Sequence, residues 1–251
     1  MAEIRTSAIV CSLRTHGENG AIVRMMTESH GLVSGYVRGG RSRRMRPILM
    51  AGNIVDAVLR ARTDDQLAGA SVELLRSRAA LMHDPMAALA VGWVTGATAA
   101  HLPEAAPFPP LHSALDGVIG AIEAAPAARG WAEPLARFEL LLLSMLGFGM
   151  DFDQCVATGT ADDLAFVSPK SGGAVSRAAA AGLEGRLFPL PPFLRGDGGA
   201  QSLTEIVQAL TITGHFIASH LPDPAWTDLM AGRARMVERL KCAVADGEAA
   251  A

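Results

Sequence analysis

Apolar and polar residues alternate in short runs over residues 1–80, and turns rich in glycine separate the runs. Alternation with a period of two predicts half-buried β-strands, and the glycines mark the turns between them. The expected strands are 4–13, 21–27, 32–37, 48–59 and 66–75, with one long polar segment before the fourth. Five short strands at this spacing predict a small closed sheet.

From residue 85 onward the apolar positions recur with helical spacing. Pro85 suits the first turn of a helix behind Asp84. The expected helices are 86–101, 111–124, 131–147, 203–220 and 224–243. Residues 150–200 lose this periodicity and are rich in Gly, Pro, Ser and Asp, which predicts a small irregular subdomain inserted in the helical part.

The chain of 251 residues is long enough for two domains, and its 50% apolar content supports a sizeable core. We therefore expect an α+β protein with several domains. Residues 1–80 form a five-stranded barrel of the oligonucleotide-binding (OB) type, although an SH3-like barrel would produce a similar pattern. Residues 81–149 and 201–245 form a helical bundle, and 150–200 form the insert.

Several classes of protein are disfavoured by what the sequence lacks. The longest apolar run, around residues 140–143, is far shorter than the roughly 20 residues that a membrane span needs. Three scattered cysteines, Cys11, Cys155 and Cys242, fit a reduced cytoplasmic protein better than a disulfide framework. Neither lysine, Lys170 or Lys241, lies in a phosphate-binding loop of ATPases, and no nucleophile elbow is present. We expect a soluble protein that is not an enzyme.

The net charge of −3 conceals an uneven distribution. Residues 1–80 hold 12 Arg against 7 acidic residues, a balance of +5, whereas residues 81–251 hold 10 basic against 18 acidic residues, a balance of −8. The basic half is dominated by the segment RGGRSRRMRP at 38–47, which we call the arginine loop. Its five arginines are Arg38, Arg41, Arg43, Arg44 and Arg46. No acidic residue lies between Glu28 and Asp56 to neutralise them.

Five guanidinium groups on one short loop repel one another unless an anion lies opposite. The loop is either a solvated surface or a site for a polyphosphate chain, and the glycines and flanking strands favour the second interpretation. Arg24, Arg60 and Arg62 are expected to add phosphate contacts. Tyr36 is the only aromatic residue of 1–80 and either stacks on a base or packs within its strand. Contacts to phosphates position a protein without reading sequence.

Arg137 is an exception in the helix expected at 131–147, which is apolar around almost its whole circumference. One interpretation is an ion pair with Glu133, four residues earlier. The other is an arginine at the rim of an apolar groove, where it would meet a carboxylate.

The order of these features resembles the bacterial RecO family of recombination mediators over essentially the whole chain. The resemblance is carried by AIVCSL at 8–13, HGE at 16–18, MTESHGLV at 26–33, RGGRSR at 38–43, RFEL at 137–140, LGFG at 146–149 and VSPKSGG at 167–173. No single segment is specific, but their joint order and spacing are.

The resemblance implies an OB-fold followed by a helical domain with a zinc-finger-like insert. It also implies binding to single- and double-stranded DNA, annealing of complementary strands, and partnership with RecR in loading RecA onto DNA coated with SSB in the nucleoid. The acidic C-terminal tail of SSB would dock on the helical domain. Arg137 matches a family position that lines this site, and Leu141 and Phe148 are expected in its apolar wall.

One departure concerns zinc, which many relatives hold with four cysteines in the insert. Here Cys155 matches the first, whereas Thr158, Ser176 and Ala179 stand at the other three positions. One thiolate does not make a tetrahedral site, and hydroxyls are poor zinc ligands. We therefore predict no metal and no cofactor, with the insert held by apolar packing. The alternative function is an RNA- or ribosome-associated OB protein that uses the same basic loop.

Overall fold

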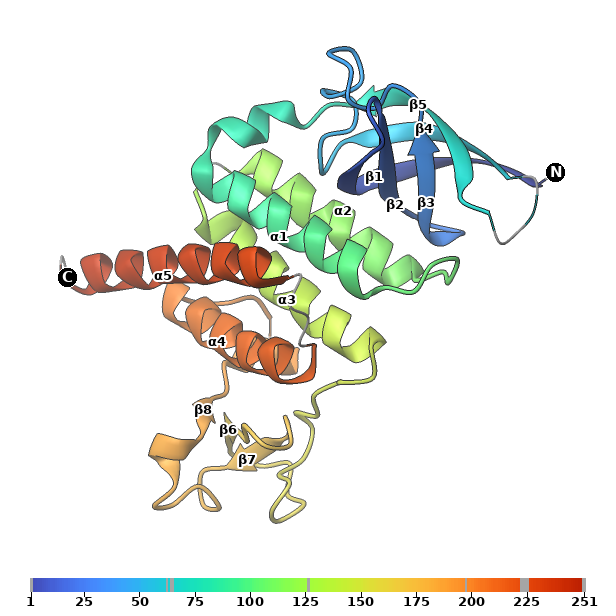
Figure 1. Cartoon of the computed structure of the whole chain (residues 1–251). Helices are drawn as coiled ribbons and strands as arrows, with labels where there is room; N and C mark the ends of the chain where they lie inside the picture. The colour runs from blue at the N-terminus through green and yellow to red at the C-terminus, as the bar shows by residue number, and fades with distance from the viewer. Residues whose placement is uncertain are drawn as a thin grey trace. The chain divides into compact units, whose positions relative to one another are not determined.

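The computed structural model describes residues 2–61, 63, 66–125, 127–196, 198–221 and 226–249. Spatial contacts divide the chain into two compact units, Met1–Pro126 and Ala127–Ala251. The first unit holds a barrel and two long helices, and the second holds three helices and a small sheet (Figure 1). Among the described residues, no helix combines the length and apolar character needed to cross a lipid bilayer.

The first unit begins with a closed barrel in the order β1-β2-β3-β5-β4. The strands are β1 (Ala2–His16), β2 (Gly20–Thr27), β3 (Gly31–Val37), β4 (Ile54–Ala61) and β5 (Ala68–Arg76). Strand β1 pairs with both β2 and β4, and a short parallel pairing of Gly35 and Tyr36 with Ala68 and Gly69 joins β3 to β5. The predicted five-stranded OB-type barrel is confirmed.

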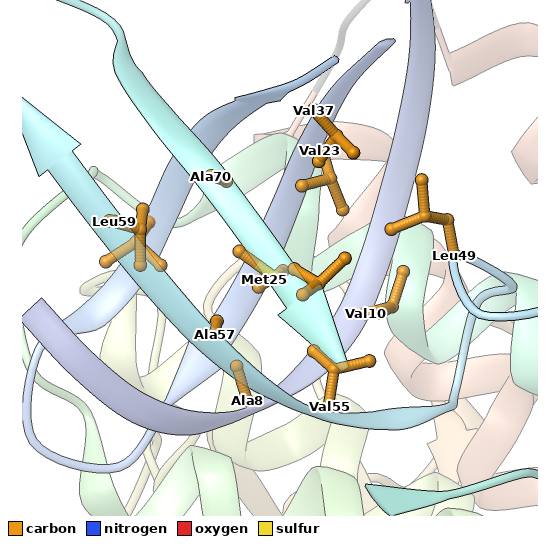
Figure 2. Packing of buried hydrophobic residues seen from close by; sticks show 12 residues of the cluster. Ala8, Val10, Val23, Met25, Val37, Leu49, Val55, Ala57, Leu59 and Ala70 are labelled. Carbon is orange, nitrogen blue, oxygen red and sulfur yellow. The ribbon is translucent and has the colours of Figure 1, made fainter. Parts of the chain in front are cut away.

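Alternate residues of these strands fill the barrel (Figure 2). The side chains of Val10, Val23, Met25 and Val55 are fully buried there, as the period of two along each strand requires. Leu49 reaches the same core from outside the strands and is 2% exposed. The barrel interior is therefore a packed apolar core.

The predicted strand 48–59 starts too early. Residues 41–49 form successive turns, and the amide nitrogen of Leu49 donates to the carbonyl oxygen of Met45 at 3.0 Å. The chain then turns at Gly52, whose φ of +87° is a conformation that favours glycine, and β4 starts at Ile54. Alternation predicted a strand here because Leu49 is buried, but it is buried as a cap on the barrel end.

Helices α1 (Pro85–His101) and α2 (Pro109–Ala124) belong to the same unit as the barrel. The carboxylate of Asp84 caps α1 by accepting hydrogen bonds from the amide nitrogens of Met86 and Ala87, and Pro85 occupies the first turn as predicted. Buried α1 residues pack on β1 and β2. The predicted bundle of 81–149 with 201–245 therefore differs from the spatial grouping, which separates α1 and α2 from the later helices.

The second unit contains α3 (Arg129–Met145), α4 (Leu203–His220) and α5 (Thr227–Ala249). The insert at 150–200 is more regular than its sequence predicts. It contains a three-stranded sheet in the order β7-β6-β8, formed by β7 (Ala174–Ser176), β6 (Leu164–Val167) and β8 (Phe188–Pro189). Three short 3₁₀ segments also occur in the described residues, Ala79–His83 in the first unit and Glu184–Arg186 and Pro192–Arg195 in the second.

Candidate nucleic-acid interface

The arginine loop is a folded structure that is fixed at both ends. At its start, Gly40 is buried and so close to β2 that a side chain there would lie 2.7 Å from the Cβ atom of Ala21. At its end, Leu49 inserts in the barrel core, with Met45 and Ile48 packed beside it. The loop therefore presents its apolar side chains to the barrel and its charged ones to solvent.

All five arginines of the loop are exposed. The guanidinium group of Arg41 donates to the carbonyl oxygen of Glu18 in the β1–β2 turn at 2.9 Å, which ties the loop to that turn. Among the described residues, no carboxylate forms an ion pair with Arg38, Arg41, Arg43, Arg44 or Arg46. These charges are thus free to meet an external anion.

A buried polar cluster holds the base of the loop. The side-chain amide of Asn53 donates to the carbonyl oxygens of Pro47 and Ile48 at 2.7 and 3.1 Å. Its own oxygen accepts a hydrogen bond from the backbone nitrogen of Arg78 at 2.8 Å. The guanidinium group of Arg78, also buried, donates to the carbonyl oxygen of Gly52 and pairs with Asp116 of α2 at 2.6 Å. The loop is therefore tied to the helical part of its own unit.

The other predicted arginines differ from those of the loop. Arg24 is half-buried, donates to the carbonyl oxygen of Ala99, and lies 3.4 Å from a carboxylate oxygen of Glu104. Arg60 is exposed but pairs with Glu3 at 2.8 Å, and this pairing holds the pKa of the Glu3 carboxyl below its usual value. The predicted site at Arg62 lies outside the described residues.

Tyr36 lies on the outer face of the barrel, half-buried beside the arginine loop. Its ring crosses Gly20, where a Cβ atom would lie 2.3 Å from the ring, and it meets the ring of His16 edge-on at 5.8 Å between centroids. The absent side chain of Gly20 thus makes room for the tyrosine. Tyr36 packs on its neighbours, as one of the two interpretations predicted, and part of its surface stays in solvent. Stacking of a base on its ring stays a prediction.

The outer face of β1, β2 and β3 carries a second group of polar residues. Strand register places Ser12, Arg24 and Ser34 in one row, one from each strand. The next row toward the loop contains Arg14, Ile22 and Tyr36. Residues paired in this way share a face and lie within side-chain reach.

Arg14 is exposed, and it was not among the residues predicted from the sequence. Because Arg14 follows Ser12 by two residues, the sequence places both on the same face of β1. Only the strand register shows which residues of β2 and β3 lie beside Arg14.

The residues predicted to receive an SSB tail lie in the second unit. Arg137 is exposed on α3, pairs with Glu133 at 2.9 Å, donates to the carbonyl oxygen of Gly198 at 2.8 Å, and lies 5.2 Å from the ring centroid of Phe193. The predicted ion pair with Glu133 is therefore present, beside an aromatic ring.

Leu141 is half-buried one turn further along α3. Phe148 follows the end of that helix and stacks on His220 of α4 at 4.7 Å.

The four positions compared with a zinc site do come together in part. The thiol of Cys155 is 2% exposed and accepts hydrogen bonds from the hydroxyl of Thr158 and from the backbone and hydroxyl of Ser176. These donors lower the pKa of Cys155 to about 6. The backbone of Ala179 contacts the Ser176 hydroxyl at 3.4 Å. Within the described residues, no three His, Cys, Asp or Glu side chains gather as a metal site.

Comparisons with known proteins place this architecture in one family. A family model described as "Recombination protein O N terminal" matches residues 1–78, and one described as "Recombination protein O C terminal" matches residues 82–228. The chain is 40% identical over 245 residues to a DNA repair protein RecO of Jannaschia sp. (strain CCS1), covering 97% of this chain and 98% of the relative. It is 41% identical over 241 residues to the protein of that name from Cereibacter sphaeroides (strain ATCC 17029 / ATH 2.4.9), covering 96% and 99%. A further relative from Rhodospirillum centenum is 42% identical over 239 residues, covering 93% of each chain.

Proposed function

Because the chain belongs to the RecO family, whose relatives bear the name DNA repair protein, we propose that it is a non-enzymatic DNA-binding mediator of repair and recombination. One observation carries the proposal: five exposed arginines, none of which pairs with a carboxylate of the described residues, lie on a loop anchored in the barrel. Phosphate is the group that such a cluster fits, because guanidinium groups bind its oxygens in pairs of charge-assisted hydrogen bonds.

Annealing follows from neutralisation of charge. Two complementary strands repel one another through their phosphates, and cations that neutralise both on one face lower that repulsion. Because phosphate contacts carry no sequence information, the protein would accept single- and double-stranded DNA of any sequence. No nucleotide hydrolysis is needed for this step, and neither zinc nor another cofactor takes part in it.

The partners that we propose are RecR and the C-terminal tail of SSB, with RecA loaded as a consequence, in the cytoplasm at the nucleoid. For the SSB tail, support comes from Arg137, whose exposed guanidinium lies over Phe193. Its pairing with Glu133 means that an incoming carboxylate would share or displace an existing partner. Leu141 and Phe148 would offer apolar surface on the same unit.

The test of the DNA site replaces Arg41, Arg43 and Arg44 by alanine. Each lost phosphate contact should reduce the dependence of log affinity on log salt by about 0.7 for single strands, so the slope should fall by about 2. Affinity at low salt should fall by roughly one to two orders of magnitude. Fluorescence anisotropy with labelled oligonucleotides at several salt concentrations measures both quantities.

The matched control removes the same charge from arginines that already have carboxylate partners. Arg5 pairs with Asp56, Arg76 with Glu123 and Arg177 with Asp163. The triple variant Arg5→Ala, Arg76→Ala, Arg177→Ala should keep most of the slope. If both triple variants lose the same slope, then binding reflects total charge, and the loop has no special role.

The alternative is an RNA- or ribosome-associated protein that uses the same loop. Competition between single-stranded DNA and RNA of the same sequence, combined with capture by an immobilised SSB tail peptide, separates the two functions. Preference for DNA with capture by the peptide supports the mediator, and preference for RNA without capture supports the alternative. The variant Arg137→Ala should reduce capture and leave DNA affinity unchanged.

A further inference from the structure

The segment that follows α1 is fixed against the start of β3. Glu104 forms a parallel bridge with Leu32, and the amide nitrogen of Ala105 donates to the carbonyl oxygen of Leu32 at 2.9 Å. At Gly31, whose φ is +67°, an added Cβ atom would lie 1.9 Å from the carbonyl oxygen of Ala106. The backbone on both sides of Glu104 therefore has a defined position beside the barrel.

This position places the carboxylate of Glu104 on the outer face of β1, β2 and β3. The hydroxyl of Ser34 donates to it, and Nη2 of Arg24 lies 3.4 Å from the same oxygen atom. A cavity of about 450 Å³ opens there, lined by Ser12, Arg14, Ile22, Arg24 and Glu104. Nε of Arg24 is buried and finds no acceptor among the described residues.

A guanidinium and a hydroxyl that converge on one anionic oxygen form a setting that a phosphate oxygen fits equally well. Arg14 borders the same cavity, is exposed, and has no ion-pair partner among the described residues. The face is also continuous with the arginine loop. Tyr36 stands between them, and Arg41 of the loop is bonded to Glu18 in the turn that joins β1 to β2.

We propose that Glu104 occupies the position of a phosphate on this face, and that a single strand of nucleic acid bound along β1, β2 and β3 displaces its carboxylate. The proposal rests on the proposed function, because it assumes that the strand reaches the arginine loop. Glu104 then acts as an internal competitor. It keeps Arg24 neutralised in the free protein and lowers affinity for the strand, which favours its release or exchange.

A single strand is the ligand that we expect because its bases can turn toward Tyr36 and stack on the exposed part of the ring. In a duplex the bases are paired and stacked with one another. The phosphates of a single strand would then follow the row from the loop through Arg14 to Arg24.

The test is Glu104→Gln, which keeps an oxygen acceptor for Ser34 and removes the charge. Affinity for a single-stranded oligonucleotide should rise about three- to fivefold at low salt, the size expected when one exposed ion pair no longer competes. Binding to the wild type exchanges one anion for another at Arg24, whereas binding to the variant releases an additional counterion. The salt slope should therefore steepen by about 0.7. A blunt duplex should gain less.

The matched control is Glu73→Gln, which removes one charge from an exposed acid on β5, outside the proposed face. It should leave the slope unchanged. A second variant, Arg14→Gln, should weaken single-strand binding in both the wild type and the Glu104→Gln background. Thermal midpoints of all variants show that the fold is intact.

Outcomes for the two proposals are distinguishable. If the wild type binds DNA through the loop but Glu104→Gln and Glu73→Gln have the same affinity and slope, the competitor role of Glu104 is wrong and the proposed function stands. Equal gains for the single strand and the duplex would also contradict it. If the wild type does not bind DNA at all, the proposed function fails first.

Discussion

The arginine loop of the first unit and Arg233 of the second unit place the same kind of side chain in opposite surroundings. The five loop arginines are exposed and have no carboxylate partner among the described residues. Arg233 of α5 is 6% exposed, and its guanidinium makes two 2.7 Å contacts with the carboxylate of Glu139 on α3. The same side chain thus serves as a free cation in one unit and as a structural contact in the other.

The helices around Arg233 are shaped to enclose it. Gly214 on α4 has no side chain where the guanidinium passes, since a Cβ atom there would lie 2.4 Å from Nη1. Nη2 of Arg233 also donates to the carbonyl oxygen of Leu210 at 2.7 Å. An arginine whose donors are used in this way joins three helices and offers nothing to a ligand. The DNA binding that we propose therefore depends on which arginines the fold leaves without a carboxylate partner.

The largest expected effect comes from breaking the enclosed pair. Glu139→Ala leaves the charge of Arg233 buried without its carboxylate, which should reduce the free energy of unfolding by about 3–5 kcal/mol. Denaturant unfolding of the full chain measures the loss. DNA affinity and salt slope should be unchanged at temperatures where the variant is folded, because the loop belongs to the other unit.

Two further variants test whether this loss of stability comes from leaving a buried charge unpaired. The double replacement Glu139→Met, Arg233→Met should recover much of the stability, since a buried pair is often replaceable by apolar packing. Glu238→Gln, which breaks the exposed pair with Lys241, should cost less than about 1 kcal/mol. If Glu139→Ala and Glu238→Gln reduce the free energy of unfolding equally, the buried pair contributes no more to stability than an exposed one.

A smaller effect should show whether DNA binding depends on the fixed position of the arginine loop as well as on its charge. Asn53→Ala removes the amide that holds Pro47 and Ile48, and it leaves buried backbone groups without partners at a cost of about 1–3 kcal/mol. The five arginines remain, but their spacing is no longer fixed. The salt slope for DNA should therefore fall although the net charge is unchanged.

The matched control for Asn53→Ala is Thr98→Ala, which removes another buried polar group of the same unit, on α1. It should lower stability without changing the slope. An unchanged slope in Asn53→Ala would mean that loop charge alone is enough for binding, and that preorganisation adds nothing.

The smallest expected effect concerns two buried cysteines, one in each unit. Burial raises the pKa of Cys11 to about 12, whereas hydrogen bonds from Thr158 and Ser176 lower that of Cys155 to about 6. A depressed pKa in the fold stabilises it fully above the unfolded thiol pKa of about 8.5, and this contribution is lost as the pH falls through about 6. Thr158→Val should therefore destabilise the protein more at about pH 9 than at about pH 5.

Ultraviolet absorbance of the thiolate, recorded with Cys11 and Cys242 replaced by alanine, follows the titration of Cys155. Thr158→Val should raise its pKa toward the usual value. In the same experiment a zinc chelator should leave the titration and the thermal midpoint unchanged if, as we predict, hydrogen bonds hold the thiolate without a metal. Metal analysis that finds about one zinc per chain would show that this interpretation is wrong.

The sequence determined the order of the elements and the identity of the charged segment. Alternation located the five strands of the barrel, although the fourth starts later than predicted, and helical spacing located the long helices, because both patterns are local consequences of burying one face. The run of arginines at 38–46 was visible directly, since no nearby acidic residue in the sequence neutralises it. The pair of Glu133 and Arg137 was equally local, one helical turn apart.

Only the tertiary structure decided which charges are free. Arg24 and Arg41 look alike in the sequence. Glu104, eighty residues from Arg24, neutralises the first, whereas no carboxylate in the described part of the chain pairs with the second. Leu49 was read as part of a strand because its burial is visible in the sequence while its role as a cap is not. Ion pairing and capping depend on residues distant in sequence that the fold brings together, and local periodicity holds no information about such distances.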